Sequence, residues 1–229
     1  MVYRVVWRVG SQEALDFWQE RLGDAGLASE RNEKSLLFRD PEDLELELEV
    51  IETTDEPLVA EHPEIPAELA LQGFDSVRVY THDPSRSAAF LEAGMGFRRE
   101  SETVYESRGR RRSHYVYDVT DRPGVGGAGT IHHVAWAAPM DEHDAWRQRV
   151  LEAGARPTPV IDRFYFRSIY FREPSGVLFE IATIGPGFAT DEPLEHLGER
   201  LSLPPAFEHL REQIEPLLTP LPDPRPARA

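Results

Sequence analysis

The sequence lacks cysteine, contains a single lysine (Lys34) and has no long hydrophobic run. Without cysteine, disulfides and thiolate metal sites are excluded, so a bound metal would need nitrogen and oxygen ligands. No stretch reaches the roughly 18 consecutive apolar residues of a membrane span, and residues 1–10 lack the basic start and cleavage site of a signal peptide. We therefore expect a cytoplasmic protein without membrane contacts.

Positive charge is also scarce, since the formal net charge is −16 over 229 residues. Such a charge repels nucleic acid, and the short basic cluster Arg108–Arg112 does not reverse it. We predict that this cluster is a solvated hairpin tip. With 40% hydrophobic residues, the chain is long enough for one large or two small cores.

A pattern of strand, helix and further strands occurs three times, and its helices read DFWQERLGDAG, AAFLEAGMGF and AWRQRVLEAGA. Recurrence at this spacing indicates a duplicated unit. We predict an α+β fold with modules at 1–72 (a linker from 53 included), 73–128 and 129–190. Residues 191–229 are expected to form a helical extension that ends in a disordered, proline-rich tail.

The third module carries the residues best suited to chemistry. Its opening segment alternates as TIHHVAWA, which predicts His132 and His133 on opposite faces of one strand. Its closing strand, VLFEIAT, places Glu180 between apolar neighbours, where an unpaired charge is costly. A metal would satisfy Glu180, because an imidazole and a carboxylate are two of the three ligands in the facial triad of non-haem iron. The alternative is a structural Glu180 bonded to Arg163 or Arg167.

The first two modules offer weaker candidates. Glu47 corresponds to Glu180, but glutamates at every second position predict a solvated face instead. Ser76 fills the position of His133, and a serine is a poor ligand. His82 and His114 remain as minor candidates.

The runs GTIHHVAW and VIDRFYFRSIYFREPSGVLFEIATIGPGF resemble the last module of the hydroquinone-type ring-cleaving dioxygenases. These enzymes belong to the vicinal oxygen chelate superfamily, which includes glyoxalases, bleomycin resistance proteins and extradiol dioxygenases. The resemblance implies tandem βαβββ modules whose curved mixed sheets form a cup. It also implies that His133 and Glu180 bind iron or manganese, and that His132, Arg163 and Tyr170 line the substrate side.

The activity implied by the resemblance is extradiol-type cleavage of a hydroquinone- or catechol-like ring with O2, by an enzyme that uses Fe(II) or Mn(II). His132 and Tyr170 would then manage protons, and Arg163 would hold an anionic oxygen or orient Tyr170. Two alternatives stay open. One is a glyoxalase-like, non-redox enzyme with Zn, Ni or Co, and the other is a non-catalytic protein that binds an aromatic compound or drug.

Members of this family have four modules, and this sequence matches the last three. The module without a counterpart is the one that normally brings the remaining histidine ligand. Because an odd number of modules leaves one sheet face open, we expect a homodimer through the last modules. Two copies of His133 and Glu180 would then converge on one metal. The other explanation is a first module that is encoded separately or lost at a misassigned start.

Overall fold

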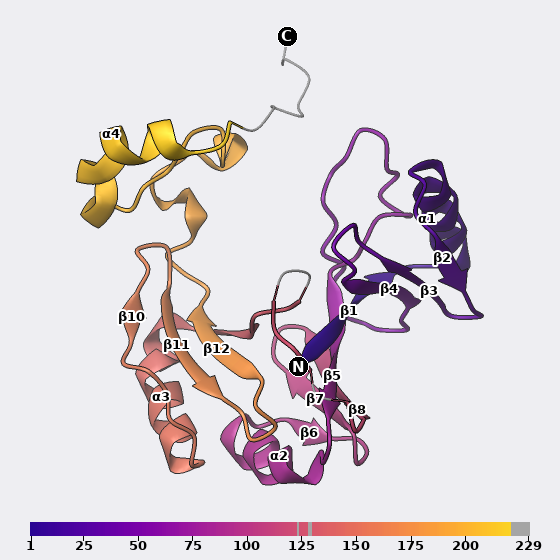
Figure 1. The fold of residues 1–229 in the computed structure, drawn as a ribbon, viewed down its shortest axis with the longest axis horizontal. Coiled ribbons are helices and arrows are strands. Elements are labelled where there is room, and N and C mark those ends of the chain that lie inside the picture. Colours follow the sequence, from indigo (N-terminus) through magenta and orange to yellow (C-terminus); the bar gives the residue numbers. More distant parts are fainter. Residues whose placement is uncertain (123, 128–129, 221–229) are drawn as a thin grey trace.

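The computed structural model describes residues 1–122, 124–127 and 130–220. The predicted module start at 129 and the tail segment 221–229 therefore lie outside the described residues. The fold is α+β with curved mixed sheets, as the sequence predicted (Figure 1). Its elements follow one another as three groups, each with a first strand, a helix and further strands, and a C-terminal extension comes after them. We call these groups modules 1, 2 and 3. Within the described ranges, no helix is long and apolar enough to cross a membrane.

Module 1 starts with a strand and a capped helix. Ser11 caps this helix, because its side chain accepts a hydrogen bond from the backbone N–H of Ala14 at 3.2 Å. Leu15 and Leu22 on the buried helix face then pack against the sheet. The elements are β1 (Val2–Val9), α1 (Gln12–Asp24), β2 (Ser29–Arg31), β3 (Ser35–Arg39) and β4 (Glu45–Val50).

Module 2 joins module 1 in one sheet. The first strands of the two modules pair antiparallel, which gives eight strands in the order β2-β3-β4-β1-β5-β8-β7-β6. The helix of this module continues into a π-helical turn. Its elements are β5 (Phe74–Thr81), α2 (Ser85–Ala89), η1 (Phe90–Gly94), β6 (Arg98–Arg99), β7 (Val104–Arg108) and β8 (Arg112–Val119).

Module 3 forms a separate four-stranded sheet in the order β10-β11-β12-β9. It packs on module 2 through an aromatic core, in which the Tyr115 and Phe179 rings lie 5.2 Å apart and the Phe90 and Phe171 rings 5.9 Å apart. On the other face of this sheet, Ala135 and Ala137 are exposed, whereas Glu180 is nearly buried. Its elements are β9 (Val134–Ala138), η2 (Met140–Glu142), α3 (His143–Glu152), β10 (Ile161–Asp162), β11 (Arg167–Arg172) and β12 (Leu178–Thr183).

The arginine-rich hairpin tip between β7 and β8 is exposed at Arg108 and Arg110, in line with the predicted solvated tip, and its last two arginines also contact the linker. Arg111 donates to the backbone oxygen of Gln72 at 2.9 Å, and Arg112 donates to the Thr53 hydroxyl at 2.7 Å. The linker at 53–72 therefore contacts this end of the tip, while the Arg112 side chain remains 42% exposed. Within the linker, residues 67–69 form a turn.

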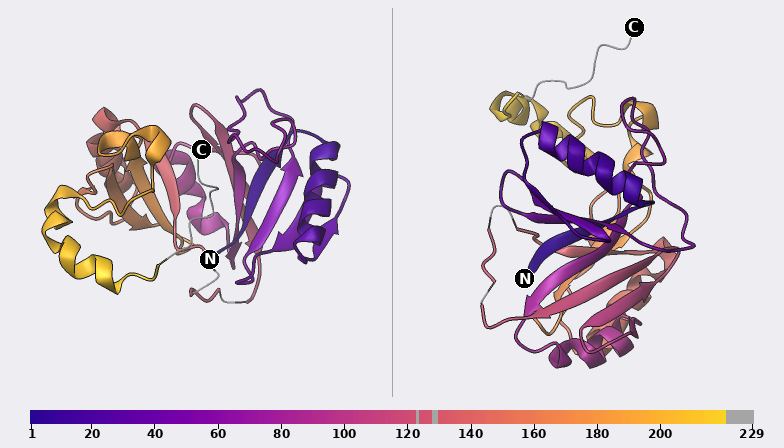
Figure 2. Two further views of the ribbon diagram at one scale, coloured as in Figure 1. Left: turned by 90° about the horizontal axis from the view of Figure 1, so that it is seen from above. Right: turned by 90° about the vertical axis from the view of Figure 1, so that its right-hand side faces the viewer.

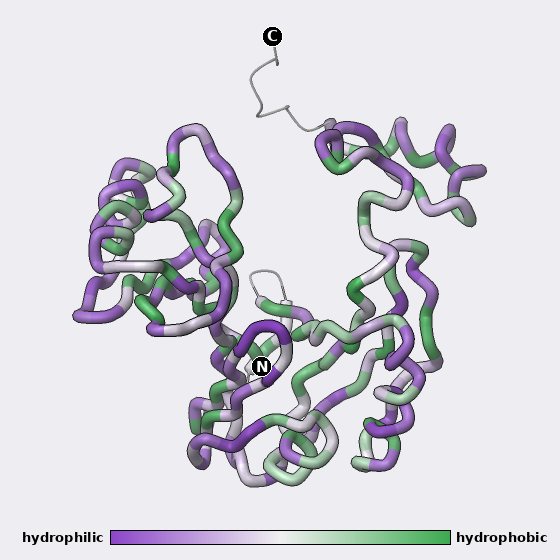
Figure 3. Tube along the Cα trace, turned by 180° about the vertical axis from the view of Figure 1, so that it is seen from behind, coloured by the Kyte–Doolittle hydropathy of each residue, from purple (hydrophilic) through white to green (hydrophobic). Residues whose placement is uncertain are grey.

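The C-terminal extension projects from module 3 as a chain of short helical turns (Figures 1 and 2). It exposes large apolar side chains, among them Phe188, Leu194, Phe207 and Leu217. Hydropathy along the chain shows hydrophilic stretches at the outer loops and hydrophobic stretches along the strands (Figure 3). The elements of the extension are η3 (Phe188–Thr190), η4 (Leu194–His196), η5 (Pro205–Leu210), α4 (Arg211–Ile214) and η6 (Glu215–Leu217).

Candidate metal and substrate site

His133 and Glu180 meet on the face of the module 3 sheet that is turned away from the aromatic core. His133 immediately precedes β9, and Glu180 lies in the middle of β12, which pairs with β9 in parallel. The His133 Nε2 and Glu180 Oε2 atoms are 2.8 Å apart, and the two side chains are 32% and 5% exposed. The structure therefore brings together the imidazole and the nearly buried carboxylate that the sequence marked as metal ligands.

Tyr170 engages the second oxygen of the same carboxylate. Antiparallel pairing of β11 and β12 sets Tyr170 opposite Glu180, and the tyrosine hydroxyl donates to Glu180 Oε1 at 2.7 Å. Arg163, the alternative partner for Glu180, instead has its Cζ atom 5.8 Å from the centre of the Tyr170 ring. This places its charge over the ring face in a cation–π contact.

His132 contacts His133 and is exposed. Their Nδ1 atoms are 2.9 Å apart, so one ring donates and the other accepts. This contact leaves Nε2 of His133 directed at Glu180. The expectation that the two histidines lie on opposite faces of a strand was wrong, because β9 begins only at Val134 and both histidines precede it. All five predicted site residues thus form one connected cluster, and their chemical roles stay predictions.

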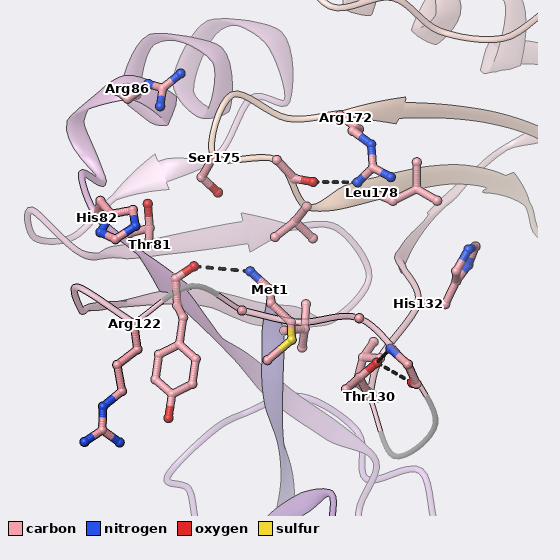
Figure 4. A pocket seen from close by; sticks show the side chains of 18 of the residues that line it. Met1, Thr81, His82, Arg86, Arg122, Thr130, His132, Arg172, Ser175 and Leu178 are labelled. Atoms are coloured by element: carbon pink, nitrogen blue, oxygen red, sulfur yellow. Dashed lines mark hydrogen bonds between the residues drawn. The ribbon is translucent and has the colours of Figure 1, made fainter.

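A cavity of about 720 Å³ lies next to His132. His132 stands at its edge, while Arg86, Arg122 and Arg172 project around other parts of it (Figure 4). Glu180, His133 and Tyr170 do not line it. The cavity therefore touches the cluster only at His132.

Strand register identifies the matching positions in module 1. Glu180 pairs with Ala135, which is two residues after His133. Glu47 pairs with Val6, which is two residues after Arg4. Arg4 Nη1 and Glu47 Oε2 are also 2.8 Å apart. A guanidinium keeps its proton and has no free lone pair, so this pair cannot hold a metal. The prediction that Glu47 lies on a solvated face was wrong, because its side chain is only 13% exposed and forms an ion pair with Arg4.

The matching positions in module 2 are Ser76 and Val116. Neither provides an imidazole or a carboxylate. Among the described residues, module 3 is therefore the one module whose equivalent positions combine a neutral nitrogen donor with a carboxylate.

A second acidic group lies on the module 1–2 sheet, where Glu100, Glu106 and His114 offer ligand atoms within 4.8 Å of one another. Ion pairs with Arg98 and Arg108 lower the pKa of Glu106 to about 2. These arginines already supply positive charge at the carboxylate.

The histidine of this group is also poorly suited to a metal. A hydrogen bond with Asp75 raises the pKa of His114, which favours its protonated form. A protonated imidazole does not bind metal. The group could hold an ion only after displacing these contacts, whereas the module 3 cluster has no such arginine pair.

Comparison with known proteins points to one group. A family model described as "Glyoxalase/Bleomycin resistance protein/Dioxygenase superfamily" matches residues 73–181. The "Putative ring-cleaving dioxygenase MhqE" of Bacillus subtilis (strain 168) is 37% identical over 215 residues, which cover 90% of this chain and 70% of that protein. The "Chlorohydroquinone/hydroquinone 1,2-dioxygenase" of Sphingobium indicum is 33% identical over 222 residues, covering 87% of this chain and 67% of that protein.

A solved structure gives the same result at the level of the fold. It is described as a "putative dioxygenase from Bacillus subtilis subsp. subtilis str. 168" and superposes with a TM-score of 0.87 at 35% sequence identity. The match covers 97% of this chain and 74% of that chain. The three-module arrangement is therefore shared with a solved relative over nearly the whole length of this chain.

Proposed function

Because the chain belongs to the glyoxalase/bleomycin resistance protein/dioxygenase superfamily, we propose that it is a metal-dependent ring-cleaving dioxygenase. The substrates in this proposal are O2 and a hydroquinone- or catechol-like aromatic compound, in line with the names of its relatives. The observation that carries the proposal is the nearly buried Glu180 carboxylate, 2.8 Å from the His133 imidazole. At the equivalent positions, module 1 has an Arg4–Glu47 ion pair, and module 2 has Ser76 and Val116, which provide neither an imidazole nor a carboxylate.

The donor atoms of the pair fit a divalent ion such as Fe(II) or Mn(II). His133 Nε2 and Glu180 Oε2 lie close enough to share one ion after a small widening, and imidazole with carboxylate is a donor set for non-haem iron. When bound, the ion supplies Lewis acidity toward a substrate hydroxyl and the redox chemistry that O2 requires.

The remaining residues of the cluster position groups and handle protons. The Tyr170 hydroxyl holds Oε1 of Glu180, which leaves Oε2 directed at His133. Arg163 lies over the Tyr170 ring, where its charge favours an anionic oxygen of the aromatic substrate. His132 is exposed at the cavity edge, which supports a role in accepting a proton from a substrate hydroxyl.

The activity is tested by anaerobic loading with Fe(II), followed by oxygen uptake with a panel of hydroquinones and catechols. We expect uptake of one O2 per ring opened, and no uptake after chelation of the metal. Turnover without O2 in protein loaded with zinc or nickel would favour a non-redox enzyme. Tight binding of an aromatic compound without metal and without uptake would favour a binding protein. Either result overturns the proposal.

Replacing Tyr170 with Phe is expected to lower the oxygen-uptake rate about 10- to 100-fold, as is typical for residues that orient a metal ligand. The loss follows from freeing Oε1 of Glu180. Iron content, measured beside kcat and KM, separates a loss of metal from a loss of proton transfer. The matched control is Tyr165→Phe, because the Tyr165 hydroxyl bonds to Asp191 and Ser202 in the extension and not to the cluster. Equal oxygen-uptake rates for the wild type and Tyr170→Phe would show that the Tyr170 hydroxyl has no role in the reaction.

A further inference from the structure

The cavity beside His132 lies between modules 2 and 3 (Figure 4). Its walls include the end of β5, part of α2 and the turn between β11 and β12. Its volume of about 720 Å³ falls within the roughly 300–1,000 Å³ of small-molecule sites. Ile131 and Leu178 add apolar surface to the lining. The cavity therefore suits a small molecule that has both an apolar and a polar part.

Positive charge dominates the lining of this cavity. Arg86, Arg122 and Arg172 line it, whereas Asp83 is the one acidic side chain among the described residues that do so. Asp83 already accepts hydrogen bonds from the backbone N–H and the hydroxyl of Ser85, at 3.0 and 2.5 Å. In the part of the chain that the structure describes, the guanidinium groups of Arg86 and Arg122 form no hydrogen bond or ion pair. In a chain with a net charge of −16, such a group of arginines favours an anionic ligand.

A buried contact fixes two of these arginines in one frame. Arg86 directly precedes Ser87 on α2, and Arg172 directly precedes Glu173 at the end of β11. The Ser87 hydroxyl donates to the Glu173 carboxylate at 2.6 Å, and both side chains are almost fully buried. The backbone N–H of Ser175 donates to the same carboxylate at 2.9 Å, which holds the turn in place. The wall is therefore formed before a ligand arrives, and this lowers the cost of binding.

We propose that this cavity binds a small organic carboxylate, for which Arg86 and Arg172 supply the positive charge. A carboxylate matches the planar donor groups of a guanidinium, and its hydrocarbon part matches the apolar surface of the cavity. The binding site stands without the dioxygenase activity. The identity of the carboxylate as a reaction product, argued next, rests on the proposed function.

Two sources supply such a carboxylate. Extradiol-type opening of a hydroquinone breaks the C–C bond beside a hydroxylated carbon, and both atoms of O2 enter the product. The hydroxylated carbon becomes a carboxylic acid and its neighbour an aldehyde, so the ring carbons are oxidised as O2 is reduced, and the acid releases its proton to water. A neutral substrate thus becomes an anion at a cluster that touches the cavity through His132. The other source is an aromatic substrate that already carries a carboxylate.

The test measures binding by calorimetry with the full chain, as purified and after chelation of metal. The probes are muconate, an acyclic dicarboxylate, benzoate, an aromatic carboxylate, and uncharged hydroquinone. In chelated protein we expect both carboxylates to bind at least about 10-fold more tightly than hydroquinone, because only they pair with the arginines. Raising the ionic strength to about 1 M, where the Debye length is about 3 Å, should weaken both. Tighter binding of muconate identifies the product as the source, and tighter binding of benzoate identifies an aromatic acid.

Arg86→Gln is expected to weaken carboxylate binding about 10-fold, as is typical for the loss of one charged hydrogen-bond donor. Its guanidinium holds no other part of the described protein, so folding should be unaffected. Arg172→Gln should give a similar loss, and thermal unfolding checks its fold because Arg172 also donates to the backbone oxygen of Gly176 at 2.7 Å. Arg110→Gln is the matched control, since Arg110 is exposed and does not line the cavity.

The outcomes separate this inference from the proposed function. Binding that disappears on chelation would place the carboxylate on the metal and overturn the cavity site. Equal binding of hydroquinone, or unchanged affinity in both arginine variants, would overturn it as well. Oxygen uptake by a protein whose chelated form binds no carboxylate overturns the cavity site and leaves the dioxygenase standing. Carboxylate binding by a protein that takes up no oxygen supports the cavity site and counts against the dioxygenase.

Discussion

Replacing Glu180 with Gln is expected to abolish iron retention and, with it, oxygen uptake. The amide keeps the size of the side chain and its contact with Tyr170, but it removes the negative charge that faces His133 at 2.8 Å. Changes to residues that only orient a ligand weaken metal binding about 10- to 100-fold, so the loss of a direct ligand should exceed about 100-fold. Iron content after gel filtration and oxygen uptake measure the two effects.

Glu47→Gln is the matched control for this substitution. It makes the same chemical change at the equivalent position of module 1, where the carboxylate pairs with Arg4. We expect iron content and oxygen uptake equal to those of the wild type, with only a modest loss of stability. A Glu180→Gln protein that keeps both iron and ring-opening activity would show that the metal lies elsewhere. The group at Glu100, Glu106 and His114 would then be the next place to look.

Replacing Arg8 with Met is expected to cause the largest loss of stability. Its side chain is 2% exposed and pairs with Asp75 at 3.0 Å and with Asp55 at 2.8 Å. Removing it leaves Asp75 with only His114, at 3.3 Å, and Asp55 with only the Arg112 side chain, at 3.5 Å, as positive partners. Breaking a buried ion pair in this way typically costs about 3–5 kcal/mol. For a chain of this size the melting temperature should fall on the order of 6–20 °C. Thermal and urea unfolding measure this loss.

The effect of Arg8→Met should depend on pH. The hydrogen bond with Arg8 lowers the pKa of Asp55 from 3.8 to about 2. A depressed pKa adds stability above the unfolded value, and this contribution disappears as the pH falls toward 2. The difference between wild type and variant should therefore be full at pH 7 and shrink below about pH 4. Arg21→Met is the control, since the exposed Arg21–Glu64 pair should contribute less than about 1 kcal/mol. A difference that stays constant down to pH 2 would contradict the ion-pair explanation.

Local patterns in the sequence were enough for much of the fold. The recurring segment DFWQERLGDAG predicted α1, and glutamates at every second position predicted the strand that carries Glu47. Both signals arise from neighbouring residues, whose geometry is set by the period of a helix or a strand. The predicted orientation of His132 and His133 on opposite strand faces was wrong for a local reason too. The alternation in the sequence begins before Val134, where the chain enters the sheet.

The sequence by itself determined the three repeated units, the absence of thiol ligands and the pair of residue types, imidazole and carboxylate, that suits a metal. Alternation states which face a side chain takes, but not which strand lies beside it. Only the tertiary structure decided that β1 pairs with β5, whereas β9 is the last strand of its sheet among the described residues. It also decided that Arg4 closes the site in module 1, whereas His133 reaches the equivalent carboxylate in module 3. These contacts join residues far apart in the chain, so they depend on how the modules pack.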